Sequence, residues 1–219
     1  MDGPDALRLE LPGEGWWQAR NSPARRVPSH GTALFGSSHA LDLIGVDERG
    51  RSGPIGWRTL LATEDPQRFV GFGRPVTAPV AGVIASVHDG EPDVRVHRSP
   101  VAYLPFALTQ PQRARRRLVG LAGNCVVIAP SSGGFAVIAH LMRGSVTVET
   151  GEWVPVGQPI GRVGNSGNSI QPHVHLQVSD TVDSRAARGL PFVLTGFRGR
   201  DGSIRRDALP REGETIRRV

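Results

Sequence analysis

The apolar residues of this 219-residue chain form short runs that are separated by glycine and proline. They do not recur at the three- and four-residue intervals that mark a long amphipathic helix. Short runs bounded by Gly and Pro are typical of strands joined by turns, and the 28 glycines and 18 prolines allow many turns. The sequence therefore predicts an all-β fold, with a compact antiparallel β-sheet core or open barrel-like sandwich and long loop insertions.

We expect one domain, because β folds of this length are often single units. Residues 1–39 are predicted to be an N-terminal strand and connecting segment packed on the core. Residues 40–180 form the predicted β core, and residues 181–219 a C-terminal strand extension of the same domain. Polar, proline-containing insertions are expected within the core at about 47–73 and 90–117. The segments that favour strands are 6–11, 40–46, 76–87, 124–129, 135–141, 145–150 and 171–178.

The basic residues are all arginine, and the net charge is +6. They are dispersed, except in the run Arg113, Arg115, Arg116 and Arg117, which we interpret as a solvated loop. No interleaved aromatic residues or nucleic-acid-binding motif accompany that run, so no specific nucleic-acid partner is predicted. The absence of lysine also excludes a biotinyl- or lipoyl-type carrier, because such carriers need an acceptor lysine.

Cys125 is the single cysteine, so the fold is expected to rest on core packing, and on a metal if one is bound. The N-terminus carries acidic residues and has no apolar run of the kind that a signal peptide needs. No apolar segment approaches the length of about 18 to 20 residues that spans a membrane. By sequence alone we expect a cytoplasmic monomer without a membrane span.

Three histidines are candidates for a reactive site. His173 and His175 are two residues apart in a predicted strand, and side chains at that spacing project from the same face. His140 lies near the end of the predicted strand FAVIAHL, where Ala136 and Ile138 would share its face. A polar imidazole there is costly unless it is paired or solvated in a cleft. For a His-x-His pair alone, two surface histidines on an edge strand remain the simpler interpretation.

Asp42 lies inside the apolar strand ALDLIGV, where a carboxylate needs a cation, a metal or backbone donors as a partner. A satisfied core aspartate is the structural alternative. Histidine and carboxylate without thiolate suit zinc, which takes three protein ligands in catalytic sites and leaves an open position for water. We therefore predict one zinc ion per chain.

Four ordered segments make a family resemblance specific. They are TAPVAGVI (77–84), AHL (139–141), GEWVPVGQPIGRVGNSGNS (151–169) and PHVHLQV (172–178). Together they resemble the lysostaphin/LytM-type zinc metallopeptidases, whose members cut peptide crosslinks in bacterial cell walls. The resemblance implies an antiparallel β core of the duplicated hybrid motif type. It also implies that Asp42 and His175 ligate zinc, and that His140 and His173 are unligated histidines that handle protons and the oxyanion.

The family's remaining zinc ligand, a histidine four residues before the aspartate, is replaced by Ser38. His39 would point to the opposite face of a regular strand from Asp42, because an odd offset reverses the direction of the side chain. His30 lies in the predicted loop VPSHGT and has no such constraint. We therefore predict His30 as the third ligand, with His39 as the alternative.

The function implied is that of a zinc metalloendopeptidase acting on peptide bonds, with peptidoglycan crosslinks as the expected substrate. This activity implies an extracellular or cell-wall location, in contrast to the N-terminal sequence. The alternative is a catalytically inactive module that binds the cell wall or a partner protein. Substitution of the first ligand position favours that alternative, whereas retention of the other four residues argues against it.

Overall fold

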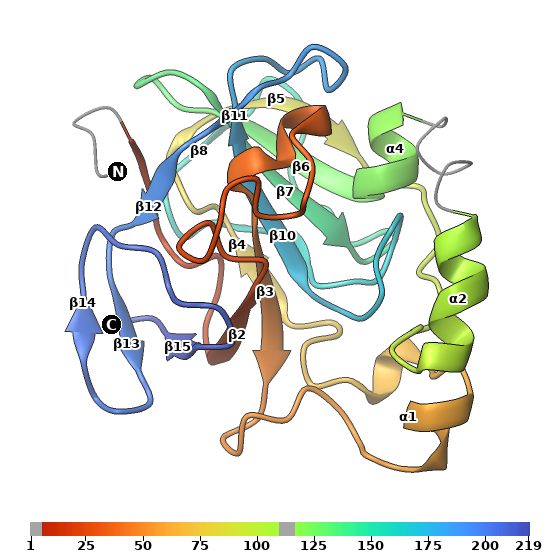
Figure 1. The fold of residues 1–219 in the computed structure, drawn as a ribbon. Helices are drawn as coiled ribbons and strands as arrows, with labels where there is room; N and C mark the ends of the chain where they lie inside the picture. Colours follow the sequence, from red (N-terminus) through yellow and green to blue (C-terminus); the bar gives the residue numbers. More distant parts are fainter. Residues whose placement is uncertain (1–5, 110–116) are drawn as a thin grey trace.

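The computed structural model describes residues 6–109 and 117–219 (Figure 1). Antiparallel strands dominate, and the main sheet contains eleven strands that do not close into a barrel within the described residues. Two further sheets contain two strands each, and only the pairing of β1 with β12 is parallel among the described strands. The predicted all-β, antiparallel fold is confirmed.

The strands, in chain order, are β1 (Leu7–Leu9), β2 (Trp16–Arg20), β3 (Leu41–Val46), β4 (Pro75–Thr77), β5 (Gly82–His88), β6 (Asn124–Ala129), β7 (Phe135–Leu141), β8 (Trp153–Val154), β9 (Pro159–Arg162), β10 (Val174–Ser179), β11 (Gly189–Leu190), β12 (Phe192–Leu194), β13 (Phe197–Gly199), β14 (Ile204–Arg205) and β15 (Thr215–Arg217). The helices are η1 (Leu34–His39), α1 (Trp57–Leu61), η2 (Pro66–Arg68), α2 (Pro100–Leu108) and α4 (Arg117–Ala122).

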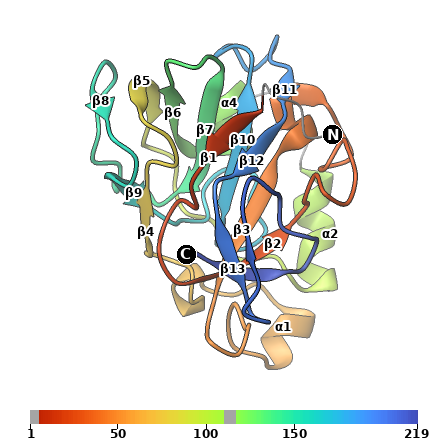
Figure 2. The same cartoon turned by 90° about the vertical axis from the view of Figure 1, so that its left-hand side faces the viewer.

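The order of the main sheet places β10 between β3 and β7. The sheet runs β14-β13-β15-β2-β3-β10-β7-β6-β5-β8, and Figure 2 shows the strands from β8 to β2 following one another across the view. His175 of β10 lies opposite Asp42 of β3 on one side and opposite Ala139 of β7 on the other. The centre of the sheet therefore brings together residues that are more than a hundred positions apart in the sequence.

One face of these central strands forms the main hydrophobic core. Leu41 and Leu43 of β3, with Val174, Leu176 and Val178 of β10, are buried in one apolar cluster. Because side chains alternate across a strand, the residues between them project from the opposite face. Packing of the apolar face thus fixes the register that carries Asp42 and His175 to the other face.

Several predicted strands are confirmed: β3, β6 and β7 match the predicted segments, and 76–87 divides into β4 and β5 around Pro79 to Gly82. The prediction missed β2, although Trp17 and Ala19 are buried in alternation with more exposed neighbours. The predicted strand 145–150 is wrong. Its amides bind Asp89 and the carbonyl of Ile160 instead of a ladder partner.

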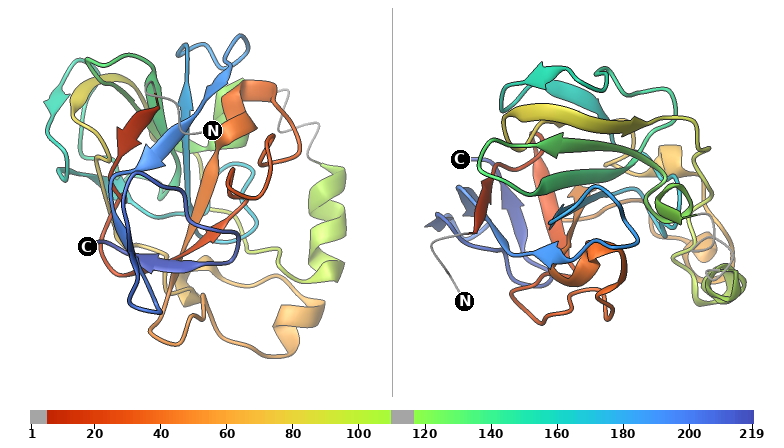
Figure 3. Two further views of the ribbon diagram at one scale, coloured as in Figure 1. Left: turned by 60° about the vertical axis from the view of Figure 1, so that its left-hand side comes forward. Right: turned by 90° about the horizontal axis from the view of Figure 1, so that it is seen from above.

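The insertions carry the helices. α1 lies in the first insertion and α2 in the second, and both lie on the opposite side of the molecule from the C-terminal strands (Figures 1 and 3). Of the arginine run, Arg113, Arg115 and Arg116 lie outside the described residues, and Arg117 begins α4. In the described part of the chain, none of the helices has the length and apolar character needed to cross a membrane.

Candidate metal centre and active site

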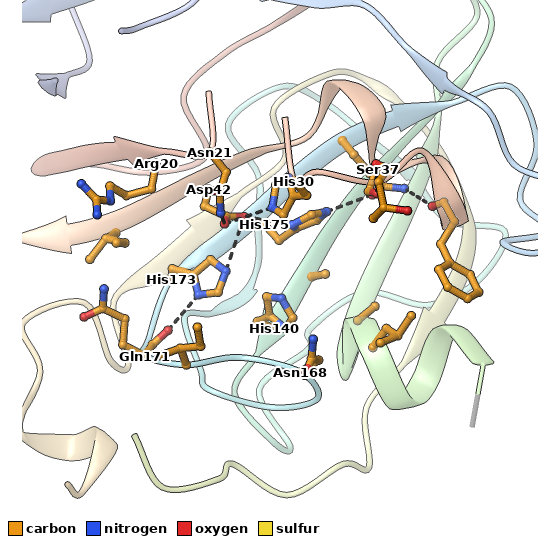
Figure 4. Close-up of a pocket in the computed structure, with 18 of the residues that line it drawn as sticks. Arg20, Asn21, His30, Ser37, Asp42, His140, Asn168, Gln171, His173 and His175 are labelled. Atoms are coloured by element: carbon orange, nitrogen blue, oxygen red, sulfur yellow. Dashed lines mark hydrogen bonds and ion pairs between the residues drawn. The ribbon is translucent and has the colours of Figure 1, made fainter. Parts of the chain in front are cut away.

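A groove of about 830 Å³ lies over the non-core face of β3, β10 and β7. Asp42, His140, His173 and His175 line it, together with His30 from the loop before η1. Figure 4 shows these five side chains grouped together, although they come from four separate segments of the chain. The groove therefore contains all five residues that were predicted to bind the metal or to catalyse the reaction.

Asp42 is the centre of the cluster. Its Oδ1 lies 2.9 Å from Nδ1 of His175, the residue directly opposite it across the strand pair. The same oxygen lies 3.5 Å from Nε2 of His173. His173 precedes β10, so it is not held by the strand, in contrast to our prediction. Its Nδ1 donates to the carbonyl oxygen of Gln171 at 2.8 Å, which orients the ring.

His30 reaches the cluster from its loop. Its Nε2 lies 3.1 Å from Oδ2 of Asp42, and its ring centre lies 5.0 Å from that of His175. The hydroxyl of Ser29, a buried residue, lies 3.0 Å from Nδ1 of His30 and also donates to the carbonyl of Ser37. The imidazole is therefore oriented by contacts on both of its nitrogens.

His39 is placed elsewhere. It ends η1 instead of lying in a strand, so our argument from strand alternation does not apply to it. Its Nδ1 lies 3.2 Å from the carbonyl oxygen of Gly189, and the residue is not part of the groove lining. Ser38, at the position where the family has its histidine, also contacts Gly189. The structure thus brings His30, and not His39, to Asp42.

His140 departs from the regular strand. Its φ is 62°, in the left-handed region, which non-glycine residues adopt uncommonly. The pairing of β6 with β7 shifts at this point, because the four residues from Ile138 to Leu141 face three on β6, from Asn124 to Val126. This β-bulge changes the direction of the side chain, so His140 lines the groove while Ala136 and Ile138 remain in the core. Our prediction of a shared face for these three residues is therefore wrong.

A buried hydrogen-bond network holds the bulge. Nδ1 of His140 donates to the carbonyl oxygen of Ser166 at 2.9 Å. The Ser166 hydroxyl donates to the carbonyl of Leu141 and accepts from the amide of Asn124. Since Nδ1 carries the proton, the neutral ring of His140 has its lone pair on Nε2.

The pKa values of Asp42 and His140 are lowered, whereas the pKa of His173 is raised. Burial disfavours the ionised carboxylate of Asp42, but the nearby His173 and His30 outweigh burial and lower its pKa well below the usual range. Burial and the neighbouring imidazoles lower the pKa of His140 well below that of a free histidine. Burial acts in the same direction on His173, but the charge of Asp42 and its hydrogen bond outweigh burial and raise its pKa. Such divergent values are typical of functional sites.

Sequence reasoning missed three supporting residues. Nδ2 of Asn21 donates to Oδ2 of Asp42 at 2.7 Å. Oε1 of Gln177 lies 2.9 Å from Nε2 of His175, while its amide nitrogen donates to the carbonyl of Phe35. Gln177 could have been found, because it lies two residues after His175 on the same strand face. Asn21 and Ser166 left no comparable signal, because their contacts come from distant segments.

The donor atoms fit a metal ion. Ligand atoms of His30, Asp42 and His175 all lie within 4.8 Å of one another, as do those of His140, His173 and His175. Two imidazoles and one carboxylate are a ligand set that zinc accepts, and they leave a coordination position free. Asn21 and Gln177 hold the ligands from behind, as outer partners do in metal sites.

The second insertion supplies one wall of the groove through His97, Arg98 and Tyr103. The guanidinium of Arg98 forms two hydrogen bonds with the buried carboxylate of Glu64, at 2.6 and 3.0 Å. Glu64 belongs to the first insertion, which holds Arg98 but contributes no groove-lining residue of its own within the described chain. Of the two insertions, the second is therefore the one that shapes the groove in the described part of the chain.

Comparison with known proteins identifies the family that this site resembles. The model of peptidase family M23 matches residues 110–186. The resemblance to LytM-type M23 peptidases is thereby confirmed. The matched segment contains His140, His173 and His175, whereas Asp42 and His30 precede it.

Three solved structures illustrate what the chain is similar to. Pseudoalterin, an M23 metalloprotease from the deep sea, is 14% identical, with a TM-score of 0.48 over 96% of this chain and 95% of its own. The catalytic domain of lysostaphin from Staphylococcus simulans is 17% identical, with a TM-score of 0.40 over 80% and 88%. The catalytic domain of the prophage-encoded M23 protein EnpA from Enterococcus faecalis is 16% identical, with a TM-score of 0.39 over 86% and 90%.

Proposed function

We propose that the chain is a zinc metalloendopeptidase that hydrolyses peptide bonds in peptidoglycan crosslinks. The observation that carries this proposal is the convergence of His30, Asp42 and His175 within 4.8 Å, beside His140 and His173. The match to peptidase family M23 supports the reaction class. Peptidoglycan as substrate implies that the chain acts at the cell wall.

In this proposal His30, Asp42 and His175 hold one zinc ion. When bound, zinc supplies Lewis acidity toward the scissile carbonyl and the attacking water. Asp42 also orients the two histidines through its separate oxygens, Oδ2 toward His30 and Oδ1 toward His175. Asn21 fixes the carboxylate by donating to Oδ2, so the geometry of the ligands is set before substrate arrives.

His140 and His173 would move the proton and stabilise the oxyanion. Each ring donates its Nδ1 proton to a main-chain carbonyl, of Ser166 and Gln171 respectively. His140 therefore presents Nε2 to the reaction, while Nε2 of His173 lies 3.5 Å from Oδ1 of Asp42. Their ring centres lie 4.6 Å apart, close enough to act on one substrate group. A preorganised donor of this kind contributes about 3 kcal/mol to transition-state stabilisation.

Zinc content and hydrolysis should be measured on the same samples. We expect about one zinc per chain by elemental analysis, and release of new amino groups from purified peptidoglycan. His175→Ala and Asp42→Ala should lose zinc and hydrolysis together. His140→Ala and His173→Ala should keep zinc and lose hydrolysis by a factor of about 100 or more. Zinc retained in full by Asp42→Ala would remove that residue from the ligand set.

One observation favours a second candidate, an inactive module that binds cell wall or a partner protein. Ser38 stands at the position where the resemblance implies a zinc ligand. Zinc-loaded protein that binds peptidoglycan in a pull-down assay but releases no amino groups would support this candidate over the peptidase. His30, 3.1 Å from Asp42, is the observation against it.

A further inference from the structure

The charges along the groove are not balanced. Its charged lining residues, apart from the histidines, are the arginines Arg20, Arg25 and Arg98 and the carboxylates Asp42 and Glu212. Arg98 is neutralised by Glu64, which lies behind the groove wall. The carboxylate of Asp42 already contacts His30 and His175. The net charge of the rest of the groove therefore depends on Arg20, Arg25 and Glu212.

Arg20 belongs to the same sheet face as the reactive site. It ends β2 and lies directly opposite Asp42 of β3, and residues opposite each other in an antiparallel pair project from the same face. Its Nε lies 3.6 Å from Oε1 of Glu212, and 52% of its side chain is exposed. The carboxylate of Glu212 has a second partner, because its Oε2 accepts a hydrogen bond from the main-chain amide of Ser22. Arg20 is therefore only partly neutralised.

Arg25 carries the uncompensated charge. It is exposed and lines the groove from the loop between β2 and η1. Across residues 6–109 and 117–219, no carboxylate forms an ion pair with its guanidinium. Its neighbour Arg26 is also exposed but is not part of the groove lining, and its guanidinium lies near Gly31 instead. One of two adjacent arginines thus faces the groove.

We propose that Arg25, assisted by Arg20, is a specificity-determining residue that binds a free carboxylate of the substrate. A guanidinium pairs with a carboxylate through two parallel hydrogen bonds, which gives both affinity and orientation. The preferred substrate is then a peptide with a free carboxylate close to the scissile bond, and not its carboxamide or an uncharged peptide such as oligoglycine. This inference rests on the proposed peptidase function and specifies its substrate class.

The test uses two forms of one substrate. Purified cross-linked muropeptides are compared in their native form, with free carboxylates, and after amidation with carbodiimide and ammonia. The kcat/KM ratio of native to amidated substrate is measured for zinc-loaded wild type, Arg25→Gln and Arg26→Gln. We expect a ratio of about ten for wild type and Arg26→Gln, and a ratio close to one for Arg25→Gln. An unchanged ratio in Arg25→Gln, or equal loss in both variants, overturns the inference.

A binding measurement separates this inference from the proposed function. Calorimetric titration of both muropeptide forms into the His140→Ala protein, with and without the added Arg25→Gln change, reports recognition without turnover. Tighter binding of the native form that disappears with Arg25→Gln supports the carboxylate site even if wild type hydrolyses neither form, and in that case the peptidase proposal fails alone. Equal or undetectable binding of the two forms overturns the carboxylate site.

Discussion

The Nδ1 proton of His140 is donated to the main-chain carbonyl oxygen of Ser166 at 2.9 Å, and this contact joins the groove to a buried polar network. Ser166 is fully buried, and its hydroxyl bonds both the carbonyl of Leu141 and the amide of Asn124. Removing the hydroxyl takes away the acceptor of the Asn124 amide, whereas the Leu141 carbonyl still accepts from Nδ2 of Asn124 at 3.0 Å. We expect Ser166→Ala to lower the free energy of unfolding by about 1 to 3 kcal/mol, measured by urea denaturation.

Ser203→Ala is the matched control for this change. Ser203 is exposed, and its hydroxyl donates to Asp201 in a surface turn. An exposed change of this kind should alter the free energy of unfolding by less than about 0.5 kcal/mol. Equal stability of Ser166→Ala and wild type would show that the network does not hold the bulge at His140.

Asn21 donates to Asp42, the proposed metal ligand, and its contribution to metal binding can be tested. Its φ is 50°, and glycine adopts that conformation freely, so Asn21→Gly removes the amide donor to Asp42 without straining the backbone. Loss of an outer partner typically weakens metal affinity by about 10- to 100-fold. We expect that loss in a zinc competition assay with a chromophoric chelator, with zinc stoichiometry still reaching one per chain at saturation. Unaltered affinity would mean that Asn21 does not support the metal site.

The two candidates for the third ligand, His30 and His39, give opposite expectations. His30→Ala should lower zinc affinity by more than about 100-fold, because loss of a ligand costs more than loss of an outer partner. His39→Ala should retain zinc, since His39 contacts Gly189 outside the groove. Zinc content after dialysis, determined by elemental analysis on both variants, checks this. The reverse ranking would exclude His30 as the third ligand.

The central strands were predictable, because an apolar face at a period of two fixes both the strand and the direction of its polar residues. The pairing of Asp42 with His175 came instead from the resemblance to LytM-type peptidases, because periodicity alone does not show which strands are neighbours. His30 was predicted only because its loop imposed no alternation. What could not be predicted were departures from regular geometry, such as the bulge at His140 and the short helix that carries His39 away.

Supporting contacts were even less accessible from the sequence. Asn21 and Ser166 act through hydrogen bonds to residues that are far away in sequence or in another segment, and no local pattern marks them. The helices of the insertions were underestimated for a similar reason. α2 contains Pro105 and begins with Pro100, which is tolerated in the first turn of a helix, so its prolines indicated a loop.

The buried ion pair between Arg98 and Glu64 should be important for the groove wall. Glu64 is 2% exposed, and removal of Arg98 would leave its carboxylate buried without its cation. We expect Arg98→Ala to cost about 3 to 5 kcal/mol of unfolding free energy. Arg8 forms an exposed pair with Asp207, so Arg8→Ala should cost less than about 1 kcal/mol. Chemical denaturation of both variants checks this contrast, and similar losses would contradict it.

Cys125 predicts how stability changes at alkaline pH. It is buried in a small apolar cluster with Ala122 and Ala139, and burial raises the pKa of its thiol to about 12. An unfolded thiol ionises near pH 8.5, so the folded protein binds this proton more tightly. The stabilising contribution of the neutral thiol is complete below about pH 8.5 and is lost progressively as the pH rises toward 12.

Two measurements check this expectation. A thiol reagent at pH 8 should modify no cysteine in the native protein and one per chain in denaturant. Urea denaturation between pH 9 and 11 should show unfolding free energy falling with pH in wild type and falling less steeply in Cys125→Ala. The absence of lysine helps, because few other side chains lose protons in this range. Rapid modification of the native thiol, or identical pH slopes, would place Cys125 in contact with solvent instead of in the core.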